Sequence, residues 1–150
     1  ELMYDFPDAR IVTIVRDPIS WYSSSSRHNI NHKNIQFAMH EWSLFAKKSL
    51  HNIRNFKNNF LGITFESLVL YPKSTMHQIC KFAGITFDEC LLKPTFLGNS
   101  ILPNSSFDNN KKGIQKSMLD RSSQLSKREA EFIERNYMDL YNEIKEILNH

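Results

Sequence analysis

One segment constrains the fold more than any other, because it joins a buried strand to a charged helix start. Residues 11–15 read Ile-Val-Thr-Ile-Val, a β-branched run typical of a parallel strand buried on both faces. Arg16 follows this run, and Asp17-Pro18 is a favoured cap and first position of a helix. Ligands of open α/β sheets gather at the carboxyl ends of strands, and helix N-termini attract anions. The segment therefore predicts half of a phosphate or sulfate site, since no Gly-rich phosphate loop occurs in the sequence.

The remaining pattern predicts one helix-rich α/β domain over residues 1–150 with a short parallel sheet. The other expected elements are a helix from Pro18 to about Arg27, a long amphipathic helix over 34–56 with Trp42 and Phe45 in the core, a strand over 60–65, a helix from Pro72 to Gly84, and a final helix opened by a Ser126/Glu129 capping box. Residues 86–110 lack periodicity and are expected to form a long functional loop. Because two strands alone make no stable sheet and residues 1–4 look like the end of a helix, we expect a truncated domain with further strands upstream or from a partner.

Composition narrows the class of partner. The formal charge of +3 and pI near 8.9 suit an anionic small molecule better than a nucleic acid. Cys80 and Cys90 have no CxxC spacing, which favours free thiols in a reducing compartment. No apolar run is long enough to span a membrane and no signal peptide opens the chain. We therefore expect a cytoplasmic protein, or a Golgi-lumenal one if it comes from a membrane-anchored eukaryotic parent.

Ser24 is the second candidate for binding an anion. It lies eight residues after Arg16, about two helical turns along, so the guanidinium fork and this hydroxyl could converge on a single phosphate. Two alternatives stay open: Arg16 could pair with Asp17 or Asp8 on the surface, and Ser24 could be a solvated helix residue among four consecutive serines.

The histidines are weaker candidates. His28 and His32 have a spacing that suits a metal on a helix, but no carboxylate or third ligand is expected nearby, and the flanking asparagines indicate a helix end. No metal is therefore expected. His40 and Glu41 lie on the expected long helix. A general base would have to reach the reacting centre, so ordinary placement on the helix surface is the favoured interpretation for both residues.

Four segments, in order along the chain, resemble the sulfotransferases that use 3′-phosphoadenosine 5′-phosphosulfate (PAPS). Residues 6–18 resemble the second cofactor segment of that family, 63–72 its YEDL-Pro strand-to-helix segment, 82–85 its FLGI helix end, and 97–107 its LG…P-NSSF loop. In the family, a strand ends in an Arg, and a Ser eight residues later joins it on the 3′-phosphate of the cofactor. By this resemblance Arg16 and Ser24 carry that role.

The resemblance implies further cofactor contacts and also shows departures. Ser105, Ser106 and Phe107 would line the adenine side, and Lys111, Lys112 and Gly113 resemble a basic loop that folds over the 3′-phosphate, or else form a solvated turn. Phe65 replaces the Tyr of the strand motif, which removes a possible hydroxyl contact to adenine. The phosphosulfate loop of the family is absent, and the catalytic base, which would lie upstream, is unknown.

The implied fold is a partial, P-loop-NTPase-like, three-layer α/β arrangement. The implied activity is transfer of a sulfuryl group from PAPS to a hydroxyl or amine of a carbohydrate, lipid, peptide or small molecule. We expect the isolated chain to bind the cofactor weakly and not to catalyse. Two alternatives remain: a kinase-like phosphoryl-transfer module that binds ATP, and a non-catalytic helical module that associates with itself or with a partner.

Overall fold

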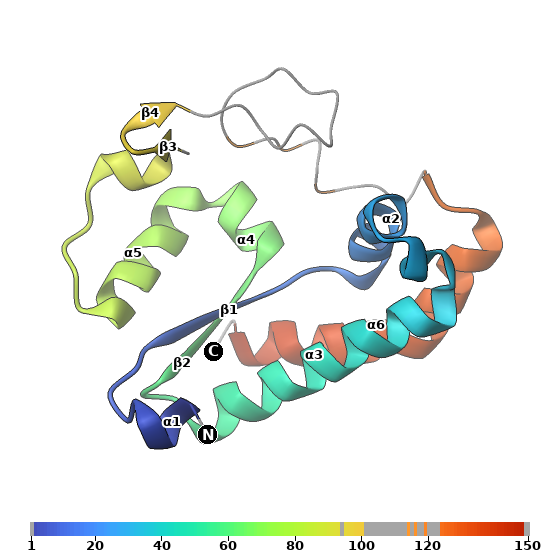
Figure 1. Ribbon diagram of the computed structural model, residues 1–150, viewed down its shortest axis with the longest axis horizontal. Coiled ribbons are helices and arrows are strands. Elements are labelled where there is room, and N and C mark those ends of the chain that lie inside the picture. Colours follow the sequence, from blue (N-terminus) through green and yellow to red (C-terminus); the bar gives the residue numbers. More distant parts are fainter. Residues whose placement is uncertain are drawn as a thin grey trace.

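The computed structural model describes residues 2–93, 95–100, 114, 116, 119 and 124–148. In this part of the chain a short parallel sheet lies among long helices (Figure 1). The elements are α1 (Leu2–Asp5), β1 (Ile11–Val15), α2 (Pro18–His28), η1 (Ile30–Lys33), α3 (Ile35–Asn55), β2 (Phe60–Thr64), α4 (Phe65–Leu70), α5 (Pro72–Ala83), η2 (Glu89–Leu92), β3 (Thr95–Phe96), β4 (Asn99–Ser100) and α6 (Lys127–Leu148). The predicted helix-rich α/β class with a short parallel sheet is confirmed.

One face of the sheet packs against two helices. Strands β1 and β2 pair in parallel, with Val15 opposite Thr64, and α3 and α6 cover the face that includes Gly62. A Cβ at Gly62 would collide with the side chain of Ile53 from α3 and come within 2.6 Å of Leu148 from α6. Glycine at this position therefore lets both helices approach the strand.

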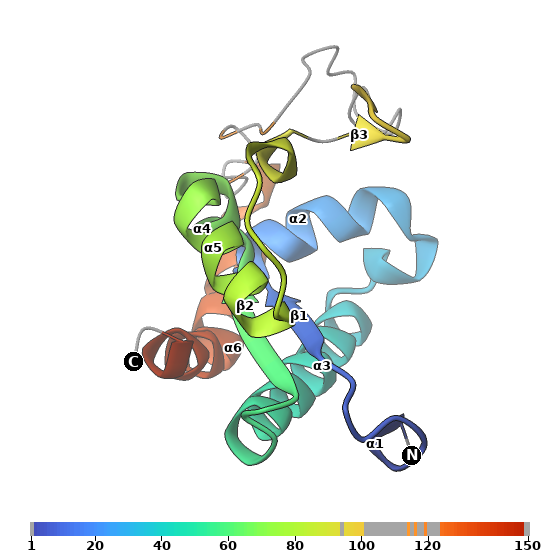
Figure 2. The same cartoon turned by 90° about the vertical axis from the view of Figure 1, so that its left-hand side faces the viewer.

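The opposite face is covered at β2 and open at β1. Helices α4 and α5 lie beside β2 (Figure 2), whereas Val12 and Ile14 of β1 are 36% and 44% exposed. Arg10 ties the start of β1 to the end of α5, because its Nη1 donates a hydrogen bond to the Phe82 carbonyl at 2.6 Å. Gly84 ends α5 with a φ of 72°, a conformation that glycine adopts without strain.

The core lies where α3 crosses α2 and α6, and it corrects one prediction. Its buried side chains include Tyr22, Met39, Trp42, Leu50, Ile133, Tyr141 and Ile144. Trp42 is buried as predicted, but Phe45, which was also predicted to be core, is 50% exposed. The buried stripe of α3 is turned toward Met39 and Leu50, which places Phe45 at its solvent edge.

The segment predicted as an irregular loop contains regular structure. Within this segment Glu89–Leu92 form the single turn η2, and Thr95–Phe96 pairs with Asn99–Ser100 in the hairpin of β3 and β4. Two-residue strands are too short to show an alternating pattern, which is why the sequence did not indicate them. Residues 101–110 of the predicted loop lie outside the described residues.

Two expectations drawn from composition can be compared with the structure. Cys80 is buried and Cys90 exposed, and both are free thiols as predicted. Among the described residues, no helix is both long enough and apolar enough to cross a bilayer.

Candidate functional site

The junction between β1 and α2 has the geometry that the sequence predicted. Arg16 follows the last residue of β1, and its carbonyl accepts a hydrogen bond from Trp42 Nε1 at 3.2 Å. Asp17 caps α2 by accepting from the Ser20 amide at 2.8 Å, and Pro18 occupies the first helical turn. The backbone that carries the guanidinium is therefore fixed both by the core and by the helix cap.

The Arg16 guanidinium lies over the ring of Phe65, with Cζ 4.4 Å from the ring centroid. Phe65 opens α4 directly after β2, so the residues that follow Val15 and Thr64 in register are brought together. From the sequence, Phe65 indicates only the loss of a possible hydroxyl contact. The structure gives its ring a different role, a cation–π contact that holds the cation at the sheet edge. Parallel pairing of the two strands was the signal that could have indicated this contact.

Glu66 links three elements at the same edge. Its Oε1 accepts from the Asp17 amide at 3.1 Å, and its Oε2 accepts from the Tyr141 hydroxyl of α6 at 2.6 Å. Burial, followed by the hydrogen bond and charge of Glu66, raises the pKa of Tyr141 well above its usual range; Asp17 adds to this and Arg16 opposes it. The Tyr141 hydroxyl is thus influenced by both carboxylates and by the Arg16 guanidinium. Neither Glu66 nor Tyr141 was predicted from the sequence, because their pairing joins residues 75 positions apart.

A cavity of about 520 Å³ opens at the carboxyl ends of the two strands. Its walls mix polar groups, among them those of Asp17, Thr64, Glu66 and Lys145, with the apolar side chains of Ile19, Leu70 and Leu119. The Lys145 ammonium also lies 4.9 Å from the centre of the Tyr141 ring. Arg16 and Ser24 are not among the described residues that line this cavity, and its walls suit a ligand with both polar and apolar parts.

The structure narrows the choice among the serines of α2. Ser23 Oγ donates to Gln124 Oε1 at 3.2 Å, and Ser25 Oγ bonds to the His32 ring. Ser24 and Ser26 are half-buried, and their hydroxyls, unlike those of Ser23 and Ser25, make no hydrogen bond to another described residue. Of the four hydroxyls, these two are therefore left to meet a ligand.

The N-terminus of α2 offers fewer amide groups for binding an anion than the sequence predicted. Pro18 has no amide hydrogen, and the Ser20 amide is already bonded to the Asp17 carboxylate. An anion at this junction would therefore be bound mainly by side chains, above all by Arg16, and less by helix amides.

Six further residues that were predicted to contact the cofactor cannot be compared with the structure. Ser105, Ser106, Phe107, Lys111, Lys112 and Gly113 lie outside the described residues. Across the ranges that the structure describes, no group of three His, Cys, Asp or Glu side chains could hold a metal.

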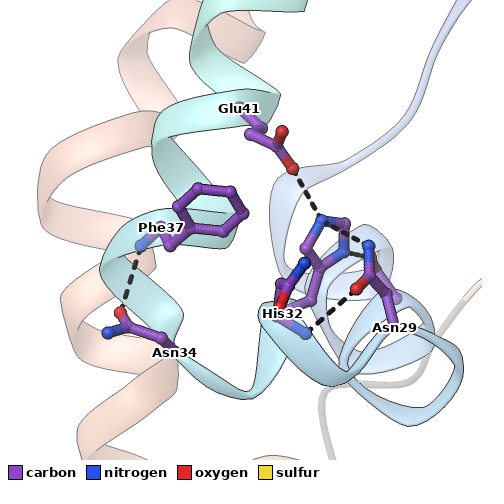
Figure 3. Close-up of polar contacts among 7 residues, drawn as sticks. Asn29, His32, Asn34, Phe37 and Glu41 are labelled. Carbon is purple, nitrogen blue, oxygen red and sulfur yellow. Dashed lines mark hydrogen bonds and ion pairs between the residues drawn. The ribbon is translucent and has the colours of Figure 1, made fainter.

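His32, which the sequence placed at a helix end, is buried. Its partner Glu41 is exposed as expected, yet its carboxylate reaches back to the His32 ring (Figure 3). Sequence spacing did not indicate this pairing, because the two residues lie in different elements.

Comparison with known proteins agrees with this architecture. The family model described as the sulfotransferase family matches residues 1–89, which contain the whole β1–α2 junction. Among solved structures, the sulfotransferase domain from the curacin biosynthetic pathway is similar in fold, with a TM-score of 0.64 and 19% sequence identity. The match covers 89% of this chain and 54% of that one, so the chain spans about half the length of that domain. No curated protein matches the chain significantly.

Proposed function

Because the chain belongs to the sulfotransferase family, we propose that it contributes the 3′-phosphate half of a PAPS site in a sulfuryl-transfer enzyme. In that reaction the bond between sulfur and the bridging oxygen of the phosphosulfate breaks, and a bond from sulfur to an acceptor oxygen or nitrogen forms. The acceptor loses its proton, and 3′-phosphoadenosine 5′-phosphate (PAP) leaves. The observation that carries the proposal is the Arg16 guanidinium, held at the end of β1 inside the matched residues.

The chemistry of the donor set fits a phosphate. The Arg16 guanidinium lies over the Phe65 ring, and a guanidinium binds a phosphate through its N–H groups. Ser24 adds a neutral hydroxyl from the next turns of α2, on a helix whose cap holds its start in place. The carboxylates of Asp17 and Glu66 also lie at this junction, and their charge opposes the anion that Arg16 attracts.

The remaining contacts follow the resemblance rather than the described geometry. We propose that Ser105, Ser106 and Phe107 line the adenine, and that Lys111, Lys112 and Gly113 close over the 3′-phosphate. The sequence contains no Gly-rich loop for the 5′-phosphosulfate, so we assign that half, and the base that activates the acceptor, to groups outside these 150 residues. The free thiols Cys80 and Cys90 favour a reducing, cytoplasmic compartment. On this basis the chain alone binds the cofactor weakly and does not turn over.

A ligand-ranking experiment tests the proposal. Equilibrium dialysis with labelled PAP and ATP should show tighter binding of PAP, because only PAP carries a 3′-phosphate. Ser24→Ala should weaken PAP binding about ten- to a hundredfold, the loss of one hydrogen bond to a charged group. Ser26→Ala, in the same helix and equally half-buried, is the matched control and should leave PAP binding unchanged.

Two outcomes would contradict the proposal. Binding of ATP at least as tight as that of PAP would favour a phosphoryl-transfer module. Equal effects of Ser24→Ala and Ser26→Ala would remove Ser24 from the site.

A further inference from the structure

His32 connects three segments of the chain through one buried ring. Its Nε2 lies 2.7 Å from Glu41 Oε2 of α3, and its Nδ1 hydrogen-bonds with Ser25 Oγ of α2. Figure 3 shows Glu41 extending from α3 to the imidazole, which η1 carries. Trp21 and Phe37 flank the ring, with centroids 5.3 Å and 6.3 Å away. The side chain is thus held by polar contacts at both nitrogens and by aromatic contacts around them.

The direction of these hydrogen bonds follows from the chemistry of the partners. Two groups lie near Nε2, Glu41 Oε2 at 2.7 Å and Asn29 Nδ2 at 3.1 Å. An ionised carboxylate can only accept, so in the shorter contact Nε2 carries the proton and donates it to Glu41, and the Asn29 amide group, itself a donor, then makes no hydrogen bond to this nitrogen. In the neutral ring Nδ1 is then an acceptor, and the Ser25 hydroxyl must donate to it. Glu41 therefore selects the tautomer that holds Ser25.

The turn between α2 and η1 fixes the position of this ring. Asn29 ends α2 by donating its amide to the Ser25 carbonyl at 3.0 Å. Its side-chain oxygen accepts from the Asn31 amide at 3.0 Å, and its carbonyl accepts from the His32 amide at 3.0 Å. Ser25, next to Ser24 in α2, is therefore linked to Glu41 of α3 through the His32 ring.

We propose that His32, oriented by Glu41, is a positioning residue that fixes the last turns of α2 and so places the Ser24 hydroxyl for the 3′-phosphate. The inference rests on the proposed PAPS site, and it adds a residue pair outside that site on which the affinity for the cofactor depends. His32 and Glu41 act through Ser25 and the α2 backbone and do not touch the ligand themselves.

A double-mutant cycle in the full chain tests this. Glu41→Ala should weaken PAP binding about three- to tenfold, the range expected for coupled neighbours. The same change in a Ser24→Ala background should have almost no further effect, because the hydroxyl that it positions is gone. Glu41→Gln should restore most of the affinity, since its amide oxygen still accepts from Nε2.

Glu143→Ala is the matched control. Glu143 forms a 2.7 Å ion pair with Arg54, and its exposure of 46% is close to the 49% of Glu41. This pair joins α6 to α3 and does not involve α2, so its loss should leave PAP binding unchanged. Circular dichroism on both variants checks that the helices are retained.

A spectroscopic measurement needs no substitution. Long-range proton–nitrogen NMR spectra should show the neutral His32 ring protonated at Nε2, with Nδ1 as an acceptor. The opposite tautomer would overturn the proposed role of Glu41.

The outcomes separate this inference from the proposed function. If Arg16→Ala binds PAP as well as the unmodified protein does, the cofactor site itself is wrong and the positioning role falls with it. If Arg16→Ala loses PAP but Glu41→Ala has no effect, or the effects of Glu41→Ala and Ser24→Ala simply add, only the positioning role is overturned.

Discussion

The two strand-to-helix junctions of this protein lie side by side at one end of the sheet but present different side chains. After β1 the chain places Arg16 and Asp17 there, and after β2 it places Phe65 and Glu66. The β1 junction opens an eleven-residue helix that is capped by Asp17, whereas the β2 junction opens a six-residue helix. In our proposal the first junction supplies the cation for the ligand, and the second junction supports that cation.

In our account one junction binds the ligand, and the other fixes the first in position. The Phe65 ring lies against the guanidinium, and the Glu66 carboxylate binds both the Asp17 amide and the Tyr141 hydroxyl. In our account the β1 junction meets the anion, and the β2 junction fixes the β1 junction in place. Substitutions at β2 should therefore reduce stability first, and those at β1 should reduce affinity first.

Removing Glu66 should have the largest effect on stability. Glu66→Ala leaves the Asp17 amide and the Tyr141 hydroxyl without their acceptor, at roughly 1–3 kcal/mol for each group. We expect the free energy of unfolding in urea to fall by roughly 2–4 kcal/mol. A loss below about 0.5 kcal/mol, the size of an ordinary surface substitution, would show that Glu66 does not hold the junction.

Tyr141→Phe should have the next largest effect, and one that depends on pH. The hydrogen bond to the carboxylate contributes about 1.5–3 kcal/mol, which the variant loses at neutral pH. Because folding raises the pKa of Tyr141 above its usual value of 10.0, its stabilisation is complete below that pH and is lost as the pH rises above it. Urea unfolding across this range should therefore show a weaker alkaline decline in Tyr141→Phe than in the exposed control Tyr71→Phe. An equal decline in both variants would contradict the assignment.

Asp17 separates the effect of charge from that of the helix cap. Asp17→Ala removes the cap on the Ser20 amide and should cost about 0.5–2 kcal/mol of stability. Asp17→Asn keeps a good cap, so stability should be nearly unchanged, while the loss of negative charge beside Arg16 should strengthen PAP binding a few-fold. Unfolding and dialysis measurements on both variants check this. Weaker PAP binding by Asp17→Asn would place the anion elsewhere.

Phe65→Leu should have the smallest effect. The cation–π contact with Arg16 contributes about 0.5–1 kcal/mol at a partly exposed site, and the leucine keeps most of the apolar contact. We expect PAP affinity to fall two- to fivefold, and Phe65→Tyr, which keeps the ring, to bind like the unmodified protein. Equal PAP affinities for the Leu and Tyr variants would show that the aromatic ring does not contribute to binding.

The local structure of both junctions could be predicted from the sequence because short-range chemistry determines it. Asp17-Pro18 begins a helix, Gly84 ends one, and the Ser126 and Glu129 side chains form the predicted reciprocal cap. Each of these signals depends on a few neighbouring residues and on backbone groups that lack a helical partner.

The side-chain contacts between elements that fix the site could not be predicted in the same way. Glu66 meets Tyr141 from another helix, and His32 meets Glu41 from another element. Such pairs depend on how helices pack, and no spacing rule along one element reveals them. Phe45 was misplaced for the same reason, because the exact face that α3 buries is set by its neighbours.

The most direct test of the account is whether Arg16 recognises the 3′-phosphate itself. Binding of PAP and of AMP, which lacks only that phosphate, should be measured for the unmodified chain, for Arg16→Ala, and for Arg27→Ala, which changes an exposed arginine near the end of α2. We predict that the unmodified chain and Arg27→Ala prefer PAP about tenfold or more, the strength of a charge-assisted hydrogen bond, and that Arg16→Ala shows almost no preference. A preference for PAP that survives in Arg16→Ala would contradict the account.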